Sequence, residues 1–371
     1  MLGEESILPA EPPTKIRVAR LAKRMESEGL DGVIVAPGPN LLYYTGVSAQ
    51  LLERPFLLFL TVEGTSHLLA PKFELGPFRE SSLEVKAHGW DDSTGPSAAF
   101  GRLLKGIETK GNWGCEGRVP FGFIENLVKQ GLKVRSADGA LQSVRQVKDK
   151  VEIENIKKAA EILCDSYEEL PGLLSPGVTE RELSRALTAQ ALEDGLEKVE
   201  PMVQSGARTA DPHAETSSRK IGRGEAIVVD TVGTYSGYTA DITRTFVIGE
   251  NEALEQAYEK VLAAQASALE ASKEGTEVGV IDSAARGSLE RDGLGRYFIH
   301  RTGHGLGLEV HEAPYITSGG KEKLADGMVF TVEPGAYLPG KFGVRIEDDV
   351  VVGEPDKVIT GELRKEFGWW R

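Results

Sequence analysis

The chain has 371 residues, with 43 Lys and Arg against 57 Asp and Glu, and therefore a formal net charge of −14. A chain of this length favours two domains, each with its own core. The acidic balance argues against a nucleic-acid partner, because binding to a phosphate backbone depends on clustered basic residues. No apolar run approaches the ~20 residues needed to span a bilayer, so we expect no membrane association.

The N-terminal segment and the two cysteines predict a cytoplasmic protein. Residues 1–14 carry three glutamates and three prolines and lack the basic start and apolar core of a secretory signal. Cys115 and Cys164 are far apart in sequence, which leaves neither a disulfide framework nor a CxxC motif. Any bound metal is therefore expected to be held by oxygen and imidazole ligands.

Helix and strand signals alternate from residue 15 to about residue 148. The spacing of Ile16, Leu21 and Met25 predicts a helix, and the apolar run 32–36 predicts a strand that ends at a Pro-Gly-Pro-Asn turn. Further strands are predicted at 56–61 and 67–70, and further helices at 98–107 and 123–130. The segment contains no Walker loop, GxSxG motif or strand-GxGxxG-helix unit. We predict a small α/β domain over residues 1–147, without a catalytic motif.

A second domain is predicted over residues 148–371, opened by a long helix that starts in the charged stretch 148–154. Part of it repeats at a shift of 98 residues: the matched pairs are Gly177 with Gly275, Asp194-Gly195-Leu196 with Asp292-Gly293-Leu294, and His213 with His311. In the first copy, Thr179 and Glu182 form a capping box that begins the second helix. The repeat predicts paired helices behind a curved antiparallel sheet, related by a pseudo-twofold axis.

Each copy of the repeat also delivers two carboxylates, one on each strand of a predicted hairpin. Asp230 and Glu333 end apolar strands, and Asp241 and Glu347 lie on the strands that follow. Burying a carboxylate without a partner costs several kcal/mol. One such residue would be interpreted as a strand end that faces solvent, but matched pairs in two copies favour a buried cation.

Histidines are concentrated in the same half of the chain. Of the six histidines, three lie within twelve residues, at His300, His304 and His311, among alternating glycines. Alternate glycines let the backbone pass close to a ligand or to another strand. A lone histidine is usually an ordinary polar residue, but this clustering predicts a functional site.

These segments resemble the pita-bread metallopeptidases of family M24, specifically the Xaa-Pro peptidase branch that contains prolidase and aminopeptidase P. The matching segments are Asp211-Pro-His213, 230–245, 300–304, 310–312, 333–335 and 344–348. The resemblance implies a creatinase-like α/β N-terminal domain over 1–147 and an α+β pita-bread catalytic domain over 148–371. Three residues depart from the usual family sequence: the pair Thr231-Val232, and Ala214. They concern the shape of the pocket and remove no ligand.

The resemblance also implies a site for two divalent metal ions. Its five ligands would be Asp230, Asp241, His304, Glu333 and Glu347, with Asp241 and Glu347 bridging. Four carboxylates can neutralise two divalent ions. Such hard oxygens with one imidazole suit manganese or cobalt, which we favour, and also zinc or iron.

The same resemblance assigns the groups that act on the substrate. These are His213, His300, His311 and Arg345, with Glu333 as the general base and Tyr337 as a weaker candidate. Arg244 and Thr245 are expected either to orient Asp241 or to lie on the strand surface. The implied reaction is hydrolysis of the peptide bond before proline by a hydroxide that bridges the metals.

Several alternatives remain open from the sequence. A methionine aminopeptidase would share the five ligands, but such enzymes usually lack the N-terminal domain and the Arg345-Ile-Glu347 arrangement. A non-catalytic peptide-binding module or a metal-free creatinase-like hydrolase would be expected to have lost ligands. The substrate is expected to be a short proline-containing peptide, with a dipeptidase slightly favoured over an aminopeptidase, and the protein is expected to be a homodimer.

Overall fold

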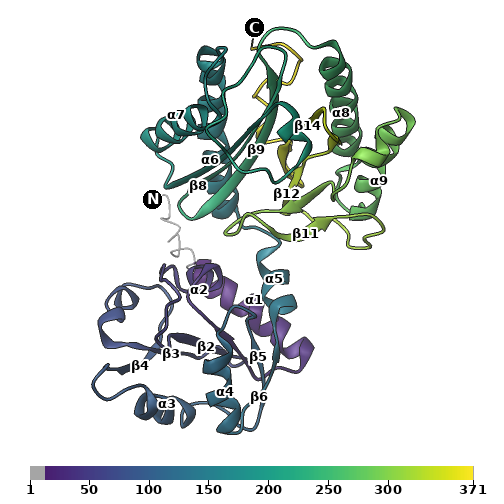
Figure 1. Cartoon of the computed structure of the whole chain (residues 1–371). Coiled ribbons are helices and arrows are strands. Elements are labelled where there is room, and N and C mark those ends of the chain that lie inside the picture. Colours follow the sequence, from purple (N-terminus) through teal and green to yellow (C-terminus); the bar gives the residue numbers. More distant parts are fainter. Residues whose placement is uncertain (1–12, 371) are drawn as a thin grey trace, which may run out of the picture. The chain divides into compact units, whose positions relative to one another are not determined.

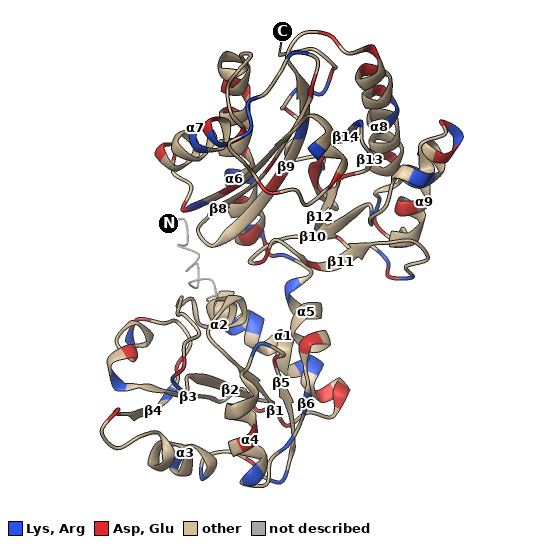
Figure 2. Ribbon diagram, in the orientation of Figure 1, with Lys and Arg blue, Asp and Glu red and all other residues tan. Residues whose placement is uncertain are grey.

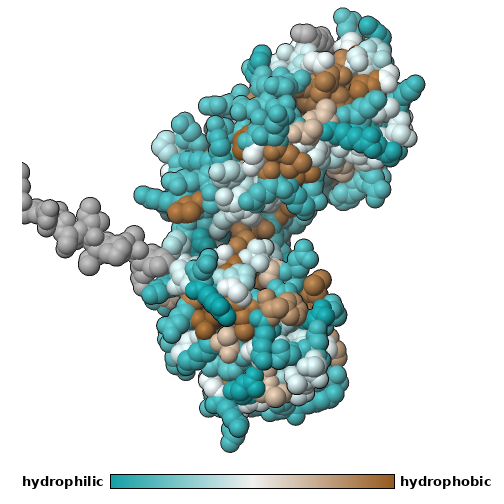
Figure 3. Space-filling model, turned by 90° about the vertical axis from the view of Figure 1, so that its left-hand side faces the viewer, coloured by the Kyte–Doolittle hydropathy of each residue, from teal (hydrophilic) through white to brown (hydrophobic). Residues whose placement is uncertain are grey.

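We analysed a computed structural model that describes residues 13–370 of the chain (Figure 1). The chain divides into two compact units, and the division falls between Arg145 and Gln146. In the described residues no helix is both long enough and apolar enough to cross a membrane. On the face drawn in Figure 3, apolar residues form separate patches among hydrophilic ones.

A mixed six-stranded sheet forms the centre of the first unit, in the order β4-β3-β2-β1-β5-β6. Its strands are β1 (Gly32–Val35), β2 (Leu57–Thr61), β3 (Ser66–Pro71), β4 (Lys86–Trp90), β5 (Asn112–Cys115) and β6 (Lys133–Ser136). Strand β2 is antiparallel to both β1 and β3, and the remaining neighbours are parallel. The strands predicted at 32–36, 56–61 and 67–70 are confirmed as β1, β2 and β3.

Helices cover both faces of this sheet, with α1, α2 and α5 on one side and α3 and α4 on the other (Figure 1). They are α1 (Pro13–Glu28), α2 (Pro39–Thr45), α3 (Ser97–Leu104), α4 (Phe121–Lys129) and α5 (Asp138–Arg145). Leu21 and Met25 of α1 are fully buried, as their helical spacing predicts. The first unit is thus the α/β layer structure expected from the sequence.

Two matched helix pairs flank the sheets of the second unit, with α6 and α7 beside β8 and β9, and α8 and α9 beside β11, β12 and β14 (Figure 1). The helices are α6 (Lys150–Glu169), α7 (Glu180–Glu193), α8 (Glu252–Ala271) and α9 (Val278–Arg291). Both pairs consist of a 20-residue helix followed by a 14-residue helix. This correspondence is the internal repeat that the 98-residue shift predicts.

The strands of the second unit include two long hairpins, one in each copy of the repeat, and β7, β10 and β11 pair beside them. The strands are β7 (Lys198–Ser205), β8 (Ala226–Tyr235), β9 (Tyr238–Val247), β10 (Gly303–Gly305), β11 (Glu312–Ile316), β12 (Val329–Val332), β13 (Gly335–Leu338), β14 (Phe342–Arg345) and β15 (Asp348–Val351). β8 and β9 form the first hairpin. In the second, β12 pairs with β15 and β13 with β14, so the hairpin is interrupted at Glu333-Pro334 and Ile346-Glu347.

Short 3-10 helices connect several of these elements. They are η1 (Lys72–Glu74), η2 (Pro77–Arg79), η3 (Leu170–Leu173), η4 (Gly206–Ala210) and η5 (Gly295–Tyr297). The hairpins also meet each other, because the backbone N–H of Glu347 donates to the carbonyl of Thr243 on β9 at 3.1 Å. The carboxylate-bearing strands of the two copies therefore lie side by side.

The core beneath the first hairpin positions its carboxylates. Tyr167 of α6 is fully buried, and its hydroxyl lies 3.1 Å from the carbonyl oxygen of Val229 and 2.8 Å from that of Ile242. These two carbonyls immediately flank Asp230 and Asp241 in the sequence. Packing of α6 against the sheet thus fixes the height and spacing of β8 and β9 at the point where their acidic residues emerge.

The capping box of α7 provides a direct test of how its start is specified. The Thr179 hydroxyl accepts from the N–H of Glu182 at 3.1 Å, and the Thr179 N–H donates back to the Glu182 carboxylate at 2.8 Å. We expect Thr179→Ala to lower the free energy of unfolding by about 1 kcal/mol, measured by urea denaturation. Thr179→Ser keeps the hydroxyl acceptor, so its free energy of unfolding should fall much less. Equal decreases in the two variants would contradict a capping role.

Candidate metal site

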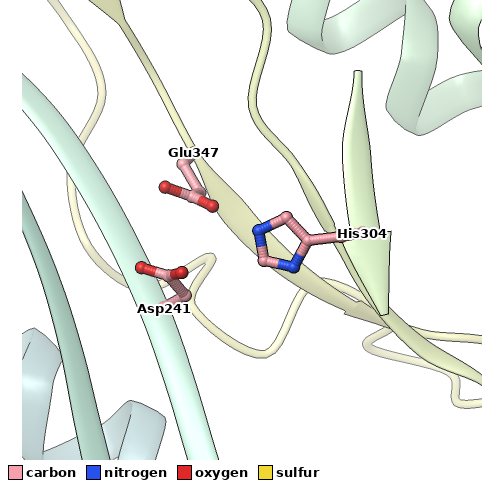
Figure 4. A group of neighbouring side chains, drawn as sticks. All are labelled: Asp241, His304 and Glu347. Atoms are coloured by element: carbon pink, nitrogen blue, oxygen red, sulfur yellow. The ribbon is translucent and has the colours of Figure 1, made fainter. Parts of the chain in front are cut away.

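Three of the predicted ligands form a buried cluster. One ligand atom from each of Asp241, His304 and Glu347 lies within 4.8 Å of the other two, and all three residues are buried (Figure 4). Asp241 comes from β9, His304 from β10, and Glu347 from the interruption between β14 and β15. Figure 2 shows acidic segments on β9 and beside β14. The cluster thus draws on both copies of the repeat.

The two other predicted ligands, Asp230 and Glu333, are half-buried at the same place. Oδ2 of Asp230 accepts a hydrogen bond from Nη2 of Arg345 at 2.6 Å. Oε1 of Glu333 lies 3.2 Å from Nε2 of His304. Together with the buried cluster, they line one cavity of about 840 Å³.

All nine residues predicted as ligands or as substrate groups line this cavity. The full lining is Glu200, Met202, Asp211, Pro212, His213, Asp230, Val232, Asp241, Ile299, His300, Arg301, His304, Val310, His311, Glu333, Tyr337, Arg345 and Glu347. The structure therefore brings together residues that lie up to 134 positions apart, from His213 to Glu347. Their roles stay predictions, because proximity alone assigns none of them.

Unpartnered carboxylate oxygens indicate what the buried cluster can hold. Oδ1 of Asp241 and Oε1 of Glu347 are buried and have no hydrogen-bond partner among the described residues. Such atoms are rare in folded proteins, because each has lost its hydration without compensation. Nδ1 of His304 lies 3.2 Å from the carbonyl of Gly305, so it can donate there and leave Nε2 as the ligating atom. These donors fit a divalent cation of the manganese, cobalt, iron or zinc type.

The electrostatics of the cluster also favour a bound cation. Burial raises the pKa of Asp241 well above its usual range, and the nearby charge of Asp230 adds to the shift. Burial and the charge of Asp241 likewise raise the pKa of Glu347. Burial would raise the pKa of Glu333. The hydrogen bond and the charge of His304 outweigh this effect and lower the pKa to about 2. A bound cation would relieve the repulsion between the carboxylates.

Two threonines support the predicted ligands, and sequence reasoning missed them. The Thr243 hydroxyl donates to Oε2 of Glu347 at 2.6 Å. The Thr331 hydroxyl lies 3.2 Å from Oε1 of Glu333 and accepts from the N–H of His304, also at 3.2 Å. Thr243 is two residues after Asp241, and Thr331 is two residues before Glu333. Because alternate strand residues share a face, this spacing was the signal that could have found them.

Arg345 begins a connected chain of hydrogen bonds along the cavity wall. Besides the bond to Asp230, its Nη1 donates to the Tyr337 hydroxyl at 2.9 Å. The Tyr337 oxygen lies 2.9 Å from Nε2 of His300, and Nδ1 of His300 lies 2.7 Å from the carbonyl of Arg301. All donors and acceptors are satisfied if His300 is neutral and protonated on Nδ1. Burial lowers the pKa of His300, which favours that neutral form.

His213 and His311 are the two histidines of the cavity that are exposed. The ring of His311 packs edge-on against that of His304, with centroids 4.2 Å apart. Burial lowers the pKa of His311, and the charges of His304 and Arg301 lower it further. The N–H of His213 donates to Oδ1 of Asp211 at 3.0 Å, which holds the turn that presents its ring. Both imidazoles are therefore accessible to a ligand in the cavity.

The interpretation of Arg244 and Thr245 as strand-surface residues is wrong. All ten residues of β9 are buried, and the side chain of Arg244 is only 1% exposed. Its Nη1 donates to the carbonyl of Glu347 at 2.6 Å, and its Nη2 to Oδ1 of Asp348 at 2.8 Å. The Thr245 hydroxyl donates to the carbonyl of Arg345 at 2.9 Å. Both side chains bind the second hairpin to β9 next to the cluster.

The alternating glycines around His304 allow close strand contact, as predicted. A Cβ atom on Gly303 would overlap the carbonyl oxygen of Thr331, and one on Gly305 would overlap that of Ala313. Strand β10 is therefore pressed between β11 and β12. This close packing fixes the backbone on both sides of the histidine that points into the cluster.

Comparison with known proteins gives two matches that together cover most of the chain. The model of metallopeptidase family M24 matches residues 154–354, and that of the creatinase/prolidase N-terminal domain matches residues 17–147. The probable dipeptidase PepE of Mycobacterium tuberculosis is 35% identical over 358 residues, with 95% of each chain covered. An Xaa-Pro dipeptidase of Pyrococcus horikoshii is 34% identical over 341 residues, which cover 91% of this chain and 94% of the relative.

A solved structure shows the same similarity in three dimensions. The crystal structure of a dipeptidase from Pyrococcus horikoshii OT3 matches with a TM-score of 0.89 at 36% sequence identity. The match covers 95% of this chain and 99% of that one. The similarity therefore extends over both units and is not confined to the cavity.

Proposed function

The chain belongs to metallopeptidase family M24, and we propose that it hydrolyses the peptide bond before proline, with Xaa-Pro dipeptides as its preferred substrates. Its second unit has the pita-bread fold that the sequence resemblance implied. The observation that carries the proposal is the buried cluster of Asp241, His304 and Glu347, with its unpartnered carboxylate oxygens. Relatives named as dipeptidases support the choice of substrate.

In this proposal, Asp230, Asp241, His304, Glu333 and Glu347 hold two divalent metal ions. Bound there, the metals would lower the pKa of a water molecule and polarise the scissile carbonyl. Asp241 and Glu347 would hold the metals through buried oxygens, one on each carboxylate, that the protein itself does not engage. Manganese or cobalt is the proposed metal, because the donors are mostly hard carboxylate oxygens.

Glu333 is the proposed proton carrier of the reaction. Its carboxylate is half-buried at the cavity wall, where it can accept a proton from the attacking water. It can then deliver this proton to the proline nitrogen as the peptide bond breaks. The Thr331 hydroxyl, 3.2 Å from Oε1, orients the carboxylate for both transfers.

The exposed imidazoles and the buried arginine complete the proposed machinery. His213 and His311 would donate hydrogen bonds to the carbonyl oxygen as negative charge develops there. Arg345 holds Asp230 and Tyr337 in place, and His300 extends that support through Tyr337. Arg345 and His300 would therefore act mainly by positioning the groups that touch the substrate.

Further parts of the proposal concern the whole chain. We assign residues 1–147 to the N-terminal domain and 148–371 to the catalytic domain. A homodimer is proposed from the frequency of twofold assemblies among soluble proteins. A cytoplasmic location is proposed because both cysteines are buried as free thiols.

Removal of divalent metal provides the first test of this function. Treatment with a chelator is expected to abolish Ala-Pro hydrolysis, and added Mn²⁺ or Co²⁺ should restore it. The metal-free protein should also unfold at a lower temperature, since a cation that binds only the folded state stabilises that state. Activity and melting temperature should therefore recover together in one metal titration.

Substrate choice separates the proposed branch from its alternatives. The restored enzyme should cleave Ala-Pro in preference to Ala-Ala, to the tripeptide Ala-Pro-Ala and to a peptide with N-terminal methionine. Preference for the methionine peptide would indicate a methionine aminopeptidase instead. Full hydrolysis after chelation would support a creatinase-like reaction, and a protein without hydrolysis or metal response would be a binding module.

A further inference from the structure

Arg301 is a cation in the cavity wall that the proposed mechanism does not use. It lies between η5 and β10, it is half-buried, and it lines the cavity. Its Cζ lies 4.7 Å from the centre of the Tyr315 ring. Among residues 13–370, no carboxylate or carbonyl accepts a hydrogen bond from its guanidinium. A half-buried guanidinium without an anion is unusual, because its donors are normally paired.

The other arginine of the cavity differs in this respect. Arg345 is buried and directs its nitrogens to Asp230, Tyr337 and Thr243. Its donors are thus occupied by the protein, whereas those of Arg301 remain available to a ligand. Of the two arginines in the lining, Arg301 is therefore the one whose donors could bind the carboxylate of a ligand.

Tyr315 fixes the position of Arg301 relative to the buried cluster of Asp241, His304 and Glu347. Tyr315 is the partner of His304 in the β10–β11 register, and paired residues on antiparallel strands point to the same face. Stacking on this ring therefore keeps the guanidinium on the cavity side of the sheet. The charge of Arg301 acts on His311, whose ring contacts that of His304. Arg301 consequently lies on the side of the cluster where the exposed His311 is found.

We propose that Arg301 binds the C-terminal carboxylate of a dipeptide substrate and thereby gives the enzyme its preference for dipeptides. This inference rests on the proposed function, which supplies the position of the scissile bond. In a dipeptide, the terminal carboxylate carbon is three bonds from the scissile carbonyl carbon, within about 4 Å. A guanidinium matches a carboxylate with two parallel hydrogen bonds. A longer peptide presents a neutral amide at that point and loses the charge.

The test compares Ala-Pro with its amide, Ala-Pro-NH2, which differs only at the terminal group. The wild-type enzyme should prefer Ala-Pro by about 10- to 100-fold in kcat/KM, the range for losing a hydrogen bond to a charged group. Arg301→Ala should raise KM for Ala-Pro by a similar factor and leave kcat within about twofold, since the carboxylate is bound equally in the ground and transition states. Its kinetics with Ala-Pro-NH2 should stay near wild type. Arg301→Lys should retain part of the preference.

Arg296→Ala is a matched control. Arg296 also stacks on a tyrosine, with Cζ 4.7 Å from the ring of Tyr297, but it does not line the cavity. This variant should leave both substrates unchanged. The inference fails if wild type cleaves Ala-Pro and its amide equally, or if Arg301→Ala loses activity on both to the same extent. A wild type that cleaves neither proline substrate overturns the proposed function, and this inference with it.

Discussion

Replacing Glu333 by glutamine is expected to lower kcat for Ala-Pro by about 100- to 10,000-fold, the usual contribution of a positioned general base. Glutamine keeps the size of the side chain but can neither accept the proton of the attacking water nor carry it to the leaving nitrogen. It also removes one negative charge from the predicted ligands. Metal binding should therefore weaken along with turnover.

The measurement pairs metal titration with steady-state kinetics at saturating metal. Glu180→Gln is a suitable control, because Glu180 is fully buried and accepts from the Ser205 hydroxyl at 2.7 Å, but does not line the cavity. The control is expected to lose stability and to keep its metal affinity and kcat. If Glu333→Gln retained kcat within a few-fold at saturating metal, Glu333 would have no role in proton transfer.

Arg345→Lys should produce the second large effect. The guanidinium makes short hydrogen bonds to Asp230 at 2.6 Å and to the Tyr337 hydroxyl at 2.9 Å. Lysine is a single point charge and cannot keep both geometries. A hydrogen bond to a charged group contributes about 1.5 to 3 kcal/mol, so we expect a loss of about 100-fold in kcat/KM. Metal affinity should fall less, about 10-fold, because Asp230 is only reoriented.

The control for this substitution is Arg219→Lys. Arg219 also forms a forked pair, with Glu225 at 2.7 and 2.5 Å, but neither residue lines the cavity. Its replacement should alter stability and leave kcat/KM unchanged. A turnover of Ala-Pro by Arg345→Lys within about twofold of wild type would show that the positions of Asp230 and Tyr337 do not depend on the arginine.

Sequence patterns predicted the strands that form continuous apolar runs and missed a largely exposed one. β1, β2 and β3 are buried along their whole length, so they appear as continuous apolar runs. β6 (Lys133–Ser136) is largely exposed, and its sequence Lys-Val-Arg-Ser carries no such run. Its place at the edge of the sheet depends on parallel pairing with β5, a contact that no local pattern encodes.

Buried polar strands caused the clearest misreading. β9 contains three threonines, an aspartate and an arginine, yet all its residues are buried. Such a strand appears half-exposed when polarity alone is considered. Thr243, Arg244 and Thr245 form hydrogen bonds with a second hairpin about 100 residues further along, as in the pair of Arg244 with Asp348. Because the compensating partner is tertiary, the local pattern could not predict burial.

The candidate site was predictable in composition but not in connections. Matched carboxylates and clustered histidines identified the residues that the cavity gathers. The sequence did not show which carboxylate faces which arginine or histidine: the pairing of Arg345 with Asp230, and of His304 with Glu333, follows from where the hairpins cross. The two-residue spacing along each strand is visible in the sequence and would have identified Thr243 and Thr331 as neighbours of the predicted ligands.

The cluster can form only after both halves of the second unit have been synthesised. Asp241 is added 106 residues before Glu347, and His304 lies between them. At ribosomal rates of about 5 to 20 residues per second, roughly 5 to 20 seconds separate the first of these side chains from the last. A nascent chain that has not yet reached Glu347 lacks the complete cluster. Binding of a cation by the complete cluster would thus follow synthesis of the chain through Glu347.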